Sequence, residues 1–119
     1  MNMGLRTENQ DALNFMLGSC SFHDASIKEF LQRDDQIDIL ITDVMGPGGP
    51  LRLALSLREV QRADFSFSYG INGSERSYMW IYGLECAVFG DEFQITFFAV
   101  PSGSMAIRFK SMAIEALAP

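Results

Sequence analysis

Apolar and polar side chains alternate along most of this chain from Ala25 onward. A period of two residues places successive side chains on opposite faces of a strand. The alternation is clearest over residues 51–58, where four leucines are separated by arginine, alanine and serine. The chain is therefore expected to consist mainly of β-strands that bury one face each.

Turn residues divide the alternating region into short strands. Residues 25–33 and 36–44 are predicted to pair as a hairpin around Asp34 and Asp35, with three isoleucines of the second strand facing inward. The leucine-rich strand follows a loop with the sequence Gly-Pro-Gly-Gly-Pro, and a separate short strand is expected from Phe65 onward.

Three more strands are expected in the second half of the chain. Residues 78–89 and 92–100 flank Gly90 and Asp91, which suit a tight hairpin with positive φ at the glycine. Pro101 then begins a turn that leads into a last strand over residues 105–115.

One short helix is expected before the strands. Thr7 and Gln10 have the spacing of a capping box, and apolar residues then recur on one side of a helix over residues 8–17. Gly18 is expected to end this helix.

These elements indicate a single mainly β domain over residues 1–119, of the all-β or α+β class. The expected architecture is an antiparallel sheet or a two-layer β-sandwich of about six to seven strands, with one short N-terminal helix. A parallel βαβ fold is excluded because the pattern contains no crossover helices.

Some strands carry large apolar side chains on both faces. Trp80 stands between Met79 and Ile81, and Phe97 is followed by Phe98. Each face must then be covered by a second sheet, by the helix or by another copy of the protein.

Composition and charge narrow the function classes. Apolar residues make up 48% of the 119, as in a globular domain, and no stretch resembles a membrane span or an export signal. The chain is therefore expected in the cytoplasm, with Cys20 and Cys86 reduced. The net charge of −6 opposes binding to nucleic acid or to an anionic membrane. It favours a basic partner, a protein or a cation, although excess charge more often serves only to keep a domain soluble.

The densest group of reactive side chains is formed by Cys20, His23 and Asp24. A Cys-His pair can form a nucleophile, but the favoured interpretation is an ordinary helix-to-strand corner, since His23 and Asp24 project to opposite sides of an extended chain. A zinc site would need two further ligands at paired spacing, so neither a metal nor another cofactor is expected.

Two other groups have ordinary explanations. The aspartates at positions 34, 35, 38 and 43 lack the spacing of a calcium loop, and they are expected on solvated turns and strand faces. The proline-rich loop lacks the donors of a phosphate-binding loop. Arg52 is expected to form a surface ion pair with Asp43 in the neighbouring strand.

The best candidate for a binding surface is aromatic. Tyr78, Trp80 and Tyr82 fall on one face of a strand, with Tyr69 on its neighbour and Arg76 in the preceding turn as part of a polar rim. Tyrosine and tryptophan are enriched at the energetic centres of protein interfaces. The same face could also fill the core, and the pattern leaves both alternatives open.

The corner and the closing strand carry a family resemblance. The step Phe22-His23-Asp24-Ala25-Ser26-Ile27 before the first hairpin, together with the last strand, is similar to a group of short bacterial β-rich proteins. Some of those proteins are assigned as immunity proteins, which neutralise a partner toxin by binding it. The resemblance implies a non-enzymatic protein that acts through its surface.

Three functions are therefore expected, in this order. The first is a non-enzymatic protein-binding module, with neutralisation of the partner as its outcome. The second is a self-associating structural or accessory protein whose aromatic strands form a homodimer interface. The third is a small hydrolase-like enzyme that uses Cys20 and His23.

Overall fold

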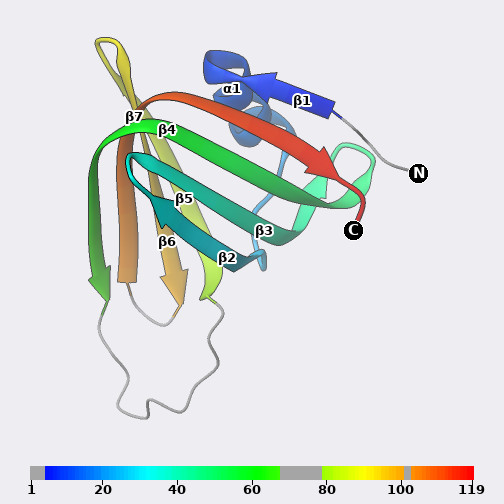
Figure 1. Cartoon of the computed structure of the whole chain (residues 1–119). Helices are drawn as coiled ribbons and strands as arrows, with labels where there is room; N and C mark the ends of the chain where they lie inside the picture. Colours follow the sequence, from blue (N-terminus) through cyan, green and yellow to red (C-terminus); the bar gives the residue numbers. More distant parts are fainter. Residues whose placement is uncertain (1–4, 68–78, 101–102) are drawn as a thin grey trace.

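The computed structural model describes residues 5–67, 79–100 and 103–119 (Figure 1). Its elements are β1 (Leu5–Glu8), α1 (Asn9–Ser19), β2 (Ser26–Arg33), β3 (Gln36–Gly46), β4 (Gly49–Phe67), β5 (Met79–Phe89), β6 (Glu92–Val100) and β7 (Gly103–Leu117). The prediction of a mainly β fold with one short helix is confirmed.

The seven strands of the described residues belong to one antiparallel sheet, in the order β1-β7-β4-β3-β2-β5-β6. The sheet curls until β6 also pairs with β7, which nearly closes a barrel. Of the two predicted architectures, the antiparallel sheet is the one observed. Because the sheet curls, its own strands cover the core that a second sheet would cover in a sandwich.

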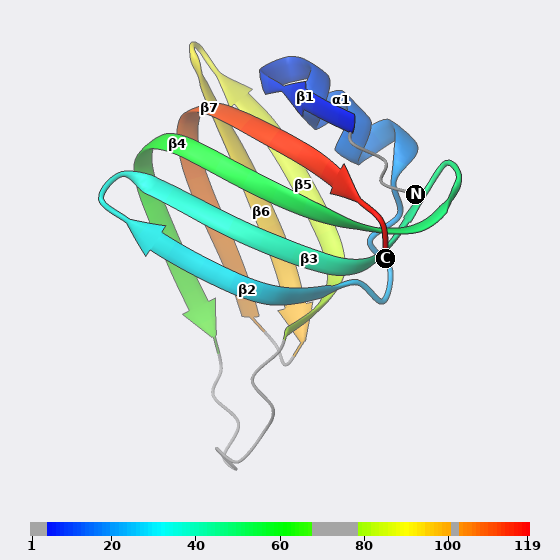
Figure 2. The ribbon, with the colours of Figure 1, turned by 45° about the vertical axis from the view of Figure 1, so that its right-hand side comes forward.

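Two long strands give the barrel its shape. β4 and β7 stay paired from Arg52 and Leu117 at one end to Phe67 and Gly103 at the other. Their first partners are β3 and β1, and beyond the bend β6 pairs with β7. The curled sheet therefore has a first layer of β1, β2, β3 and parts of β4 and β7, crossed by a second layer of β5, β6 and the remaining parts (Figures 1 and 2).

The prediction of two separate strands over residues 51–58 and from Phe65 was wrong, because β4 is continuous. Its register shifts between Val60 and Arg62, and Glu59 has a φ of 54°. A bulge of this kind bends a strand and changes which residues face inward. The alternation is therefore interrupted in the sequence although the strand continues.

The predicted hairpins are present. Arg33 pairs with Gln36 across the two aspartates, and Phe89 pairs with Glu92 across a turn in which Gly90 has a φ of 65°. The Gly-Pro-Gly-Gly-Pro loop forms a tight connection between β3 and β4, since Gly46 pairs directly with Gly49.

The N-terminus differs from the prediction. Thr7 does not cap a helix but pairs with Ile114 as part of β1. This strand was not predicted, because the capping-box spacing indicated the start of a helix there. The helix begins at Asn9, whose φ is 50° and whose side-chain oxygen accepts a hydrogen bond from the Met112 amide at 3.0 Å. Gly18 lies inside the last turn of α1 and does not end it.

One hydrophobic core fills the curled sheet. It combines the inward leucines and isoleucines of β3 and β4 with Ala12, Leu13 and Met16 of α1, which packs against β1 and β7. Ile81 and Phe97 also point into this core. β5 and β6, which carry large apolar side chains on both faces, therefore need no second sheet on their outer side. Phe98 packs over Gly83 there, and Trp80 remains on the surface.

The one helix among the described residues, α1, has 11 residues and is neither long nor apolar enough to cross a membrane.

The core predicts a clear contrast between two leucine substitutions. Leu53→Ala removes a fully buried side chain and should lower the free energy of unfolding by about 2–5 kcal/mol. Leu17→Ala removes a side chain that is 54% exposed on α1, and it should change stability by less than about 0.5 kcal/mol. Urea unfolding followed by circular dichroism measures both, and equal losses would contradict the position of the core.

Candidate functional site

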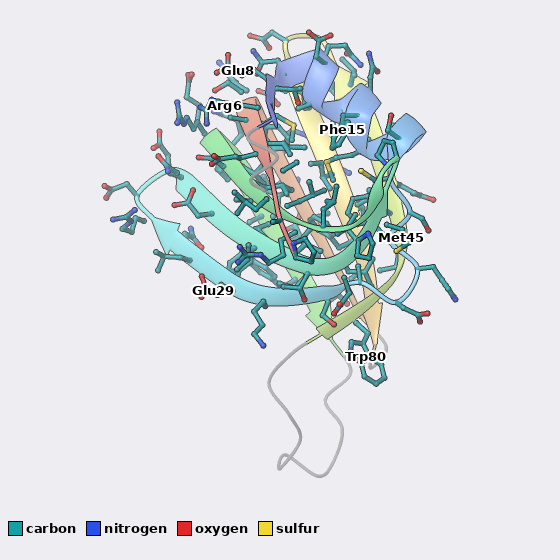
Figure 3. The ribbon with its side chains drawn as sticks, turned by 90° about the vertical axis from the view of Figure 1, so that its right-hand side faces the viewer. Arg6, Glu8, Phe15, Glu29, Met45 and Trp80 are labelled. Carbon is teal, nitrogen blue, oxygen red and sulfur yellow. The ribbon has the colours of Figure 1, made fainter. Side chains whose placement is uncertain are left out.

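Trp80 lies on the outer surface of the barrel. It pairs with Ser26 of β2 on one side and with Val100 of β6 on the other, and its side chain is 53% exposed. Its neighbour Ile81 is buried, since successive strand residues point to opposite faces. Figure 3 shows the Trp80 side chain pointing away from the ribbon.

The other aromatic candidates do not join Trp80 in a described cluster. The register of β5 shifts between Ile81 and Gly83, so Tyr82 stands at a bulge, and the regular alternation that placed it on the same face as Trp80 is broken there. Tyr69, Arg76 and Tyr78 lie outside the described residues, and so does the side chain of Tyr82.

A polar depression of about 350 Å³ begins at Trp80. Ser26, Lys28, Thr42 and Asp43 complete its lining. Thr42 and Asp43 form a bulge in β3, with Asp43 at a φ of 61°, so both side chains reach this surface. The depression thus combines one large aromatic ring with a cation, a carboxylate and two hydroxyl groups.

A second depression, of about 310 Å³, adjoins the first and shares Lys28, Thr42 and Asp43 with it. It extends to Arg52 and the C-terminal residue Pro119. Among the ion pairs of the described residues, the predicted Arg52–Asp43 pair does not occur. Arg52 Nε instead donates a hydrogen bond to the Ala118 carbonyl at 2.9 Å, which ties the C-terminus to β4.

A third depression, of about 280 Å³, continues along the same face of the first layer. Its floor is formed by small and apolar side chains from four neighbouring strands: Leu31, Leu40, Ala54, Ser56 and Ala113. Its charged lining consists of Glu29, Asp38 and Glu115 against Arg6. Three carboxylates and one guanidinium give it a negative balance.

The three depressions together are called the outer-face groove here. Leu40 and Ala54 of the third depression stand two positions from Thr42 and Arg52 of the second, on the same faces of β3 and β4. The groove therefore runs from Trp80 in the first depression, past the charged side chains of the second, to the third depression with its apolar floor and three carboxylates.

The structure gives Cys20 different surroundings from His23 and Asp24. His23 Nε2 lies 3.7 Å from Asp24 Oδ2, with both side chains exposed, while Cys20 packs half-buried against the core. Burial raises the pKa of the Cys20 thiol to about 11, which disfavours the reactive thiolate.

The expectation that His23 and Asp24 project to opposite sides was wrong. It assumed an extended chain, whereas the backbone turns there: Asp24 has a φ of 72°, and the Ala25 amide donates to the Phe22 carbonyl at 2.9 Å. A turn brings neighbouring side chains together.

The predicted aspartates lie on turns and strand faces. Asp34 and Asp35 occupy the β2–β3 turn, and Asp38 accepts hydrogen bonds from Gln36 Nε2 at 3.1 and 3.3 Å. Within the described part of the chain, no three histidine, cysteine or acidic side chains are arranged to hold a metal ion.

Sequence reasoning missed the acidic end of the outer-face groove. The signal was present as outward positions held by small residues, Ala54 and Ser56 in β4 and Ala113 in β7. Using that signal requires the strand order and register, which place these residues side by side.

Comparison of the chain with protein-family models, curated proteins and solved structures finds no match. The function must therefore be argued from the site itself.

The raised thiol pKa predicts slow alkylation of Cys20. In a Cys86→Ser variant at neutral pH, iodoacetamide should modify Cys20 about a hundredfold more slowly than an unperturbed thiol, because far less thiolate is present. The rate should climb steadily as the pH approaches 11. Alkylation as fast as that of free glutathione, or a large loss of rate in His23→Ala, would support a catalytic pair instead.

Proposed function

We propose that this chain is a non-enzymatic protein-binding module that captures a basic partner protein on its outer-face groove. The observation that carries the proposal is the position of Trp80, half-exposed at the corner of a groove that crosses the first layer. Tryptophan dominates binding energy at protein interfaces more often than most residues, because it buries a large area and keeps a polar N–H.

The lining of the groove supports a protein partner over a small metabolite. Its three depressions are each partly open to solvent, and they follow one another across several strands. A small-molecule site usually encloses most of its ligand in one cavity. Three partly open depressions in series suit an extended protein segment.

Charge supports a basic partner. Glu29, Asp38 and Glu115 line the acidic end of the groove, and the whole chain has a net charge of −6. Complementary charge speeds association and disfavours acidic competitors. A partner segment with lysine or arginine beside an apolar side chain would match both the carboxylates and the floor formed by Leu31 and Leu40.

The same proposal places the chain in the cytoplasm of a bacterial cell, where binding would neutralise the partner. The resemblance of residues 22–27 and the last strand to proteins that include immunity proteins supports this part. The raised pKa of the Cys20 thiol disfavours one alternative, a hydrolase that uses Cys20 as its nucleophile.

The proposal predicts that Trp80→Ala abolishes capture while the fold persists. The tagged protein is purified from its own cells, with the products of adjacent genes co-expressed. Mass spectrometry identifies the bound proteins, and light scattering gives the molar mass of the eluted complex. A near-stoichiometric basic partner is expected, and Trp80→Ala should weaken its binding by about thirtyfold or more. Trp80→Phe should retain part of the affinity.

Val88→Ala is the matched control. Val88 is also on β5 and is 53% exposed, but it stands eight residues from Trp80, about 25 Å along the strand. Capture should survive this change. Equal binding by Trp80→Ala and the unmodified protein, or a protein that emerges with no foreign partner, would refute the proposal.

A further inference from the structure

The strand β2 has an open edge. It pairs with β3 from Ser26 to Arg33, but with β5 only at Ser26 and Ile27. Lys28 is the extra residue of a bulge in β2, and among the described strands Glu29 to Arg33 have a partner on one side only, so β2 forms the margin of the first layer in Figure 2. An open edge presents backbone N–H and C=O groups that can pair with another strand.

The hairpin fixes which groups face that edge. Arg33 and Gln36 are opposite each other across a two-residue turn, so they bond to each other. Bonded positions alternate along an antiparallel pair, so Leu31 and Glu29 also point their backbone groups toward β3. Phe30 and Gln32 consequently point theirs outward, toward a strand that would be added.

Apolar side chains collect at this edge. Leu31 is 52% exposed on the outer face. On the inner side, Phe30 packs edge-on against Phe65 of β4, with ring centroids 5.7 Å apart, and Phe65 is itself about half exposed. Covering this edge would remove apolar surface from water on both faces of the sheet.

We propose that a second copy of this chain covers the edge, with the two β2 strands paired antiparallel about a two-fold axis at Leu31. In this register Phe30 of one copy exchanges backbone hydrogen bonds with Gln32 of the other, as the outward-facing groups require. Leu31 faces Leu31 at a non-bonded position, where side chains approach most closely.

Charge complementarity selects this register. With Leu31 on the axis, Glu29 of each copy faces Arg33 of the other, which gives two pairs of opposite charge. Backbone bonding allows shifts only by whole two-residue steps. One shift puts Glu29 opposite Leu31, and the other puts Glu29 opposite Asp35, so both pairs are lost. Charged side chains on an edge strand usually prevent it from pairing with another chain. Here the charges of one copy are complementary to those of the second copy.

Arg33 is available for this contact. Its side chain is 68% exposed and its guanidinium lies 3.7 Å from Asp38. Asp38 also accepts hydrogen bonds from Gln36, so its carboxylate keeps a donor when Arg33 turns toward the second copy.

The pairing would extend the binding surface. Because the two-fold axis runs through the sheet, both outer faces point to the same side. Glu29 and Leu31 line the acidic depression beside the shared edge, so the two outer-face grooves would meet there. This goes beyond the binding of a foreign partner: the dimer would present two grooves on one continuous sheet.

A cysteine placed on the axis tests the register. Two Leu31→Cys residues would have Cα atoms about 4.5 Å apart, within the range that a disulfide spans. Mild oxidation should convert this variant to a covalent dimer, while the unmodified protein, with Cys20 and Cys86, should not cross-link. Gln32→Cys is the matched control, because the two residues would be roughly 8 Å apart and on the inner face.

Charge exchange tests the interface. Sedimentation equilibrium of the full chain should give twice the monomer mass of 13.3 kDa. Arg33→Glu should raise the dimer dissociation constant about tenfold or more, since two attractive pairs become repulsive. The double variant Glu29→Arg with Arg33→Glu should restore the dimer, with circular dichroism confirming the fold of each variant.

Three outcomes would overturn the inference: a monomer at every concentration, a dimer indifferent to Arg33→Glu, or cross-linking at Gln32 equal to that at Leu31. A monomer that loses a foreign partner through Arg33→Glu would assign the edge to that partner and would also overturn it. Trp80→Ala should leave the dimer mass unchanged, so this inference and the proposed function fail separately.

Discussion

The pairing of β4 with β7 is the constraint on which the rest of this structure depends. The two strands remain paired along almost their whole length, from Arg52 opposite Leu117 to Phe67 opposite Gly103, with one register shift between Val60 and Arg62. Because they bend together at the bulge near Val60, one sheet becomes two crossed layers around a single core. Every other strand is placed by its pairing with this bent ribbon or with a strand that the ribbon already holds.

The local pattern predicted what depends on local physics. The inward isoleucines of β3, the leucines of β4 and the turn at Gly90 were read correctly, because alternation and turn chemistry act over a few residues. The bend of β4 and the strand β1 were missed. A bulge hides continuity, and the four residues of β1 become a strand only through pairing with β7.

The candidate site was predictable in part. The sequence indicated Trp80 as a binding residue but could not decide between core and surface, because that choice depends on which face the curled sheet encloses. Closure of the barrel encloses Ile81 and leaves Trp80 outside. The third depression is lined by Glu29 and Glu115, which belong to strands far apart in the sequence, so no local pattern predicts it. This exposed arrangement supports a binding role better than it supports a catalytic one.

The central claim is that Trp80 stands on the surface as the anchor for a partner. The chain contains one tryptophan, so its intrinsic fluorescence reports on this side chain alone. Acrylamide quenching should be strong in the free folded protein and should fall when the captured partner is bound. Weak quenching with blue-shifted emission in the free protein would place Trp80 in the core, and quenching unchanged by the partner would place the interface elsewhere.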